Sequence, residues 1–91
     1  MQARLLRIEG RVQGVGYRDW LVREARRLGL DGWVRNRRDD SVEALICGDE
    51  AAVQALLTAC RRGPALARVD RIEESFAEAP DEPGFARRAT V

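Results

Sequence analysis

The sequence predicts an α+β fold in which two helices cover one face of an antiparallel sheet. Several short segments alternate between apolar and polar residues, as half-buried strands do. Two longer segments carry apolar residues at the spacing of amphipathic helices. Glycine, proline or aspartate separates most of these segments, where turns are expected.

The first strand and the first helix are predicted to flank a glycine-rich turn. Residues 4–12 alternate between apolar and charged side chains, which predicts a half-buried strand. Its apolar face consists of Leu6, Ile8 and Val12. The turn occupies residues 13–16, and residues 17–28 then take up helical spacing. Gly29 followed by Leu30 fits a helix end, where a left-handed glycine precedes an apolar residue.

A hairpin and a second helix are predicted next. Residues 32–37 and 42–46 read as strands, and the turn Asp39-Asp40-Ser41 joins them. The second helix is expected to begin after Asp49 and to end at Gly63-Pro64. Its buried stripe consists of Val53, Leu56, Leu57 and Cys60.

The last part of the chain completes the order β-α-β-β-α-β. A fourth strand is predicted over residues 67–73, although Val69 and Ile72 interrupt its alternation. Residues 77–84 form a polar loop, and residues 85–91 could add a short edge strand. This order is that of the ferredoxin-like fold, and we expect residues 1–91 to form a single domain.

The predicted topology brings two distant segments to one place. The first two strands run parallel with another strand between them, so their C-terminal ends lie at the same edge of the sheet. The loop of residues 13–18 leaves the first of these ends, and Asn36 lies near the second. We therefore expect the loop and Asn36 to face one small site.

Composition excludes several classes of function. The 91 residues contain neither histidine nor lysine, which removes the commonest general base and the P-loop lysine. Cys47 and Cys60 are too few for a zinc site and are expected to be buried. A net charge of +1 disfavours nucleic acid as the main partner. Apolar runs are too short to span a membrane, and no signal peptide is evident, so the cytoplasm is the expected compartment.

The turn at residues 13–16 has the features of an anion-binding loop. Gly14 and Gly16 let main-chain N–H groups converge, and the following helix offers more N–H groups and a positive dipole end. Arg18 is unfavourable at such an end unless an anion binds there. From the pattern alone, anion binding and a surface ion pair with Asp19 are equally favoured. For Asn36, a structural role at the end of its strand is the more favoured reading.

The sequence GRVQGVGYR, residues 10–18, closely resembles the signature of the acylphosphatase family. The segment LGLDGWVRN, residues 28–36, is similar to the second conserved block of that family. Shorter matches follow in order at Val42-Glu43, at Gly48 and at Gly63-Pro64-Ala65, so the resemblance covers nearly the whole chain.

The resemblance implies an enzyme that hydrolyses the carboxyl–phosphate bond of acyl phosphates without a metal or another cofactor. It implies that Arg18 and the loop Gln13, Gly14, Val15, Gly16 and Tyr17 bind the phosphate, and that Asn36 orients the attacking water. The leaving carboxylate needs no general acid, because its conjugate acid has a pKa of about 4. A phosphate oxygen of the substrate is expected to accept the water's proton.

Some positions depart from the family pattern. Tyr17 stands where phenylalanine is frequent, and its hydroxyl needs water or a partner. Asp40 occupies a turn position where glycine is frequent, which predicts a modest loss of stability. In some relatives the C-terminal region contacts the catalytic arginine, which makes Val91 a candidate for such a contact.

Four nearby residues are given structural roles. Asp19 and Asp39 are interpreted as helix-start and turn residues, and Trp20 and Trp33 as packing residues.

Two other functions compete with that of a free enzyme. An RNA-binding module would need more exposed aromatic residues on the strands. An accessory domain of a larger carbamoyl-transfer protein is the other alternative. We expect a monomer that acts on a small acyl phosphate, with neither nucleic acid nor membrane as partner.

Overall fold

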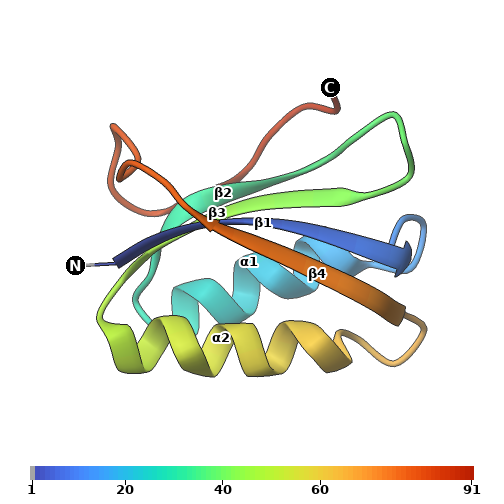
Figure 1. The fold of residues 1–91 in the computed structure, drawn as a ribbon, viewed down its shortest axis with the longest axis horizontal. Coiled ribbons are helices and arrows are strands. Elements are labelled where there is room, and N and C mark those ends of the chain that lie inside the picture. The colour runs from blue at the N-terminus through green and yellow to red at the C-terminus, as the bar shows by residue number, and fades with distance from the viewer. Residues whose placement is uncertain (1) are drawn as a thin grey trace.

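The structure, a computed structural model that describes residues 2–91, contains five strands and two helices. In chain order they are β1 (Gln2–Arg11), α1 (Tyr17–Arg27), β2 (Asp31–Asn36), β3 (Val42–Gly48), α2 (Glu50–Arg62), β4 (Arg68–Phe76) and β5 (Phe85–Arg87). Both helices lie on the same face of the sheet (Figure 1). The predicted α+β ferredoxin-like fold is confirmed, and the described elements follow the predicted order.

The strands form one sheet in the order β4-β1-β3-β2-β5. The first four strands pair antiparallel, whereas β5 pairs parallel with β2. The sheet is therefore mixed, which corrects the expectation of an antiparallel sheet. After β4, at one edge, the chain crosses to the opposite edge and enters beside β2 in the same direction (Figure 1). A parallel neighbour requires such a crossover connection.

The core lies between the sheet and the two helices. It contains the predicted stripe of α2 and the buried residues Tyr17, Leu21 and Ala25 of α1. The strands contribute Leu6, Ile8, Val34, Ala44 and Ile46, all of them inaccessible to solvent. At about 25 cal/mol per Å² of apolar area, this burial is the main force that holds the helices on the sheet.

The end of α1 has the predicted cap. The Leu30 N–H donates to the Ala25 carbonyl at 2.9 Å, and the Gly29 N–H donates to the Arg26 carbonyl at 3.1 Å. These two bonds define a Schellman motif, which turns the chain sharply into β2.

A bulge explains the irregular pattern of β4. Glu9 pairs with Arg71, but the next residue, Gly10, pairs with Val69, so β4 has one extra residue at this point. The extra residue shifts the alternation by one position. As a result, Val69 and Ile72 both pack against the core although they are three residues apart.

Candidate active site

The loop after β1 has the geometry of an anion-binding turn. Gly14 and Gly16 have φ angles of +73° and +79°, and Gly16 is the N-cap of α1. A Cβ at either position would contact nothing within 4 Å, so glycine is needed for its backbone conformation. The first hydrogen bond of α1 is from the Trp20 N–H to the Gly16 carbonyl, at 3.1 Å. The N–H groups of residues 17–19 therefore remain available at the positive end of the helix dipole.

Arg18 is half-buried in the first turn of α1. Within residues 2–91 its guanidinium forms no hydrogen bond and no ion pair. Partial burial lowers the pKa of Arg18, and repulsion from the nearby Arg87 guanidinium lowers it further. Both effects penalise the charged form, and a bound anion would offset them.

Arg18 lines a hollow of about 220 Å³. The hollow is lined by Val12, Gly14, Gly16, Tyr17, Arg18, Asp19 and Arg87. A hollow of about 340 Å³ elsewhere is larger, but its lining includes Glu9, Asp39, Asp40 and Asp70. Arg68 is the one arginine in that lining, so the four carboxylates leave it net negative and unfavourable for a phosphate group, whereas the hollow at Arg18 has two arginines and one carboxylate.

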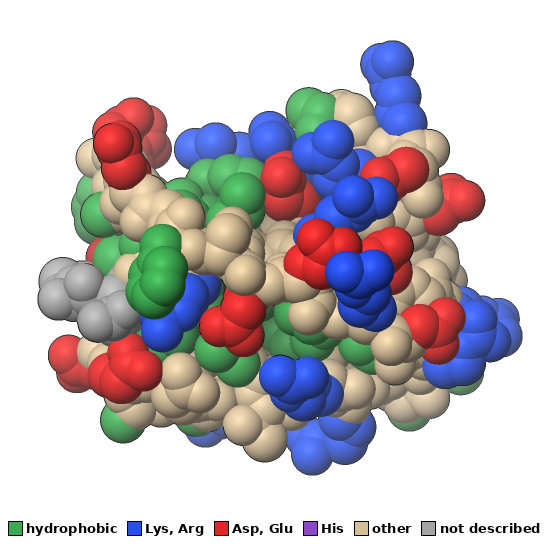
Figure 2. All heavy atoms as spheres, in the orientation of Figure 1, with side chains coloured by type: hydrophobic (Ala, Val, Ile, Leu, Met, Phe, Trp, Pro, Cys, Tyr) green, Lys and Arg blue, Asp and Glu red, His purple; other side chains and the backbone are tan. Residues whose placement is uncertain are grey.

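Charges of both signs are mixed over the surface of the protein seen in Figure 2. Arginine and acidic side chains are interspersed over the face shown in Figure 2, in keeping with a net charge of only +1. A surface with both signs mixed produces little long-range steering. Any preference for an anion on this protein would therefore depend on the residues that line a particular hollow.

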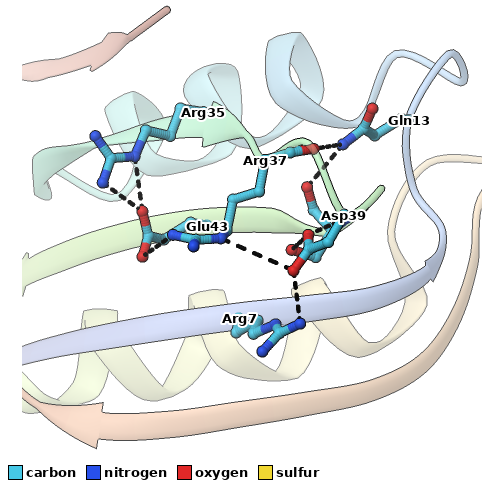
Figure 3. A network of polar contacts seen from close by, with 7 residues as sticks. Arg7, Gln13, Arg35, Arg37, Asp39 and Glu43 are labelled. Carbon is cyan, nitrogen blue, oxygen red and sulfur yellow. Dashed lines mark hydrogen bonds and ion pairs between the residues drawn. The ribbon is translucent and has the colours of Figure 1, made fainter. Parts of the chain in front are cut away.

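The Gln13 side chain anchors the loop and is not available to a ligand as a donor. Its Nε2 donates to the main-chain carbonyls of Arg37 and Ser41, at 2.8 Å each (Figure 3). These two bonds use both N–H groups of the amide. Gln13 thus ties the loop after β1 to the hairpin turn between β2 and β3, which leaves its main-chain N–H for a ligand.

The side chains of Val15 and Tyr17 also pack within the protein. Val15 packs against the hydrophobic core, and Tyr17 is almost fully buried. The Tyr17 hydroxyl donates to the Cys60 carbonyl at 2.8 Å, which is the partner that this hydroxyl needs. Both residues can therefore reach an anion only through the main chain.

The structure places Asn36 at the same edge of the sheet as the loop. Ile8 of β1 and Asn36 of β2 both pair with Val42 of β3, one on each side. Two strand spacings separate them, or about 10 Å. The Asn36 Oδ1 is buried and has no hydrogen-bond partner among the described residues. Such an orphaned acceptor costs about 1–3 kcal/mol, which is typical of sites that a ligand or water completes.

Ion pairs on the open face of the sheet hold the residues on either side of Asn36. The Glu43 carboxylate accepts from Arg35 Nε at 2.7 Å and from Arg37 Nη1 at 3.2 Å (Figure 3). Arg7 pairs with Asp39 in the hairpin turn, 2.6 Å from its Oδ2. The network therefore fixes the end of β2, where Asn36 lies.

The C-terminal segment lies along β2 and not against Arg18. The Val91 N–H donates to the Asn36 carbonyl at 3.1 Å, and the Arg38 N–H donates to the Val91 carbonyl at 2.8 Å. No hydrogen bond or ion pair joins Val91 to Arg18 in the part of the chain that the structure describes. Val91 therefore supports the strand that carries Asn36.

Arg87 also lines the hollow at Arg18, where the sequence did not predict it. It comes from β5, 68 residues beyond its ion-pair partner Asp19, whose Oδ1 is 2.7 Å from Arg87 Nη1. The hydrogen bond from Arg87 lowers the pKa of Asp19. The available signal was an arginine two residues after Phe85, which places both side chains on one face if residues 85–87 are extended.

Comparison with known proteins identifies the family. The model of the acylphosphatase family matches residues 5–87. The chain belongs to the acylphosphatase family. An acylphosphatase from Acidiphilium cryptum is 63% identical over 90 residues, which are 99% of each chain. An acylphosphatase from Rhodospirillum rubrum is 55% identical over 91 residues, the full length of both.

Solved structures agree with this assignment. The crystal structure of acylphosphatase from Bacillus subtilis superposes with a TM-score of 0.91 at 34% identity, covering 97% of this chain and 99% of that one. A full-length HypF superposes with a TM-score of 0.89 at 27% identity, but this chain covers only 12% of it. The predicted family and enzyme class are confirmed by relatives that match along their whole length.

Two further observations concern the described residues 2–91. They contain no group of three potential metal ligands that could hold an ion. None of their helices is both long and apolar enough to cross a membrane.

Proposed function

We propose that the protein hydrolyses the carboxyl–phosphate bond of acyl phosphates and releases a carboxylate and inorganic phosphate. The observation that carries the proposal is the Arg18 guanidinium, which has no protein partner among residues 2–91 and lies beside a turn of available N–H groups. Membership of the acylphosphatase family supports the same reaction. We propose that residues 1–91 act as one domain in this role.

The substrate phosphate is held by the loop and by Arg18. Main-chain N–H groups of Gln13, Gly14, Val15, Gly16 and Tyr17 surround its oxygens, and the planar guanidinium of Arg18 binds two of them. These donors stay in place during the reaction, so they stabilise the charge that develops on the equatorial oxygens. Phosphoryl transfer depends mainly on such positioning and charge stabilisation.

Asn36 orients the attacking water. Its buried Oδ1 lacks a protein donor among the described residues and can accept a hydrogen bond from the water. The water oxygen forms a bond to phosphorus as the bond between phosphorus and the carboxylate oxygen breaks. The proton of the water passes to a phosphate oxygen, so no separate base is required. The carboxylate leaves without protonation because the pKa of its conjugate acid, about 4, lies well below neutral pH.

Hydrolysis of acetyl phosphate in the presence of a chelator tests this proposal. We expect Arg18→Ala to reduce turnover by at least about a hundredfold, as removal of a preorganised donor does. Arg23→Ala is the matched control, because Arg23 is an exposed arginine of the same helix. It should retain the parent rate.

Circular dichroism and thermal unfolding must show that both variants are folded. If a folded Arg18→Ala variant hydrolyses acetyl phosphate at the parent rate, the phosphate does not bind at Arg18. If chelation abolishes the activity of the parent protein, the metal-free mechanism is wrong.

A further inference from the structure

Arg87 lines the same hollow as Arg18 but belongs to a different element, the edge strand β5. We propose that Arg87 is a second anion-binding residue of this hollow, and that Asp19 holds its guanidinium at the rim. This inference rests on the proposed function, since it assigns another residue to the same phosphate. Arg18 comes from the first turn of α1, whereas Arg87 comes from the last residue of β5.

The register of β5 explains why Arg87, and not its neighbour, reaches the site. Arg87 pairs with Val34 in the parallel ladder, and Phe85, two residues earlier, is buried in the core beneath the sheet. Alternation places the Arg87 side chain on this same helix-covered face. Arg88 points to the other face, where its guanidinium lies 5.0 Å from the centre of the Trp33 ring.

Two guanidiniums in one small hollow repel each other. The repulsion is large enough to lower the pKa of Arg18, where it is the second cause after burial. Such an arrangement is unfavourable for the protein alone and becomes favourable with a dianion between the two charges. The hollow of about 220 Å³ is large enough to hold a phosphate group.

The ion pair between Arg87 and Asp19 is weak enough for Arg87 to leave Asp19 when an anion binds. The Arg87 and Asp19 side chains are 47% and 61% exposed, so water screens their attraction. A phosphate dianion carries more charge than one carboxylate and offers more acceptor oxygens. Arg87 can therefore turn from Asp19 to the phosphate with little loss. While paired, it also neutralises a carboxylate that would repel an incoming anion.

Binding of inorganic phosphate, measured by isothermal titration calorimetry, tests the proposal. We expect Arg87→Ala to weaken phosphate binding about tenfold, as the loss of one charge-assisted contact does. Arg87→Lys should restore part of the affinity because it keeps the charge. Arg88→Ala is the matched control and should bind phosphate as the parent does, because Arg88 lies on the other face of the sheet.

Asp19→Asn separates binding by Arg87 from mere neutralisation of Asp19. Asp19→Asn removes the partner of Arg87 and also the carboxylate that would repel an anion, so the test is to add Arg87→Ala to this variant. If Arg87 binds the anion, Arg87→Ala weakens phosphate binding about tenfold in the Asp19→Asn background as well. If Arg87→Ala has no effect in that background, Arg87 acts only by neutralising Asp19, and the proposal is overturned.

Arg18→Ala distinguishes this inference from the proposed function. If Arg18→Ala weakens phosphate binding and Arg87→Ala does not, Arg87 is not an anion ligand and the proposed site stands without it. If neither variant changes the affinity, phosphate binds outside this hollow and both proposals fail.

Discussion

The Tyr17 hydroxyl donates a 2.8 Å hydrogen bond to the main-chain carbonyl of Cys60, inside the core. The carbonyl belongs to the last turn of α2, where helical partners run out. The residue four positions beyond Cys60 is Pro64, which has no N–H to donate. Tyr17, the first residue of α1, thus completes the end of the other helix.

Replacing Tyr17 with phenylalanine should lower the free energy of unfolding by about 1.5 kcal/mol. The substitution keeps the ring but leaves the Cys60 carbonyl buried without a partner. Urea unfolding measures the effect. Turnover of acetyl phosphate should stay at the parent level, because only the main chain of Tyr17 is proposed to contact the phosphate. An unchanged stability would show that the hydrogen bond contributes nothing.

Stability should fall in alkaline solution through Cys60 and Tyr17. Burial raises the pKa of the Cys60 thiol from 9.0 to about 12, and burial also raises the pKa of Tyr17 far above its ordinary 10.0. In the unfolded chain both groups ionise at their ordinary pKa values. The folded state therefore holds more protons above pH 9, and stability decreases as pH rises.

The expected slope is about 1.4 kcal/mol per pH unit above pH 9, and twice that above pH 10. Urea unfolding at a series of pH values from 8 to 10.5 measures it. In Cys60→Ala the slope between pH 9 and pH 10 should fall to the small contribution of Tyr17, even though the lost packing lowers stability at every pH. The same slope in this variant would assign the effect to other groups.

Asp40→Gly should stabilise the protein by about 0.5–1 kcal/mol. Asp40 has a φ of +72° and is the one described non-glycine residue with a positive φ. Its N–H donates to the Arg37 carbonyl, and the Arg37 N–H donates to the Ser41 carbonyl, which defines a three-residue hairpin loop. Glycine is favoured at the left-handed position of such a loop. This geometry explains why glycine is frequent at the position that Asp40 occupies.

Arg38→Gly in the same loop is the control for that prediction. Arg38 has no positive φ, so glycine relieves no strain there and only adds freedom to the unfolded chain. The variant should lose about 0.5–1 kcal/mol in thermal or urea unfolding. If both glycine variants are destabilised, the left-handed conformation of Asp40 carries no measurable strain.

Asn36→Leu should separate stability from activity. Removing the orphaned buried Oδ1 should leave the free energy of unfolding unchanged or raise it by about 1 kcal/mol. Turnover of acetyl phosphate should fall about a hundredfold, because the water loses its orientation. Urea unfolding and steady-state kinetics on the same preparation give both values. A variant that loses stability and activity together would indicate a structural role for Asn36.

The sequence was sufficient to predict the order of the elements because that order depends on local chemistry. Apolar spacing predicted α1 and α2, and glycine at positions 16, 29 and 63 marked their ends. Boundaries of strands were less accurate. The strand predicted over 67–73 is Arg68–Phe76, because a bulge against Gly10 hides its true alternation. A bulge of this kind depends on how β4 pairs with β1. The apolar pattern of β4 alone does not reveal that pairing.

The local features of the site follow from the sequence alone: a left-handed glycine turn, an arginine at a helix start, and a polar residue at the end of β2. Which distant residues contact these features depends on how the chain folds. The tertiary structure pairs β5 parallel with β2, brings Arg87 into the hollow of Arg18, and engages the Gln13 amide with the hairpin turn. The physical reason is that such contacts join residues far apart in the chain. They follow from strand order and register, whereas turns and helix ends follow from the few residues that form them.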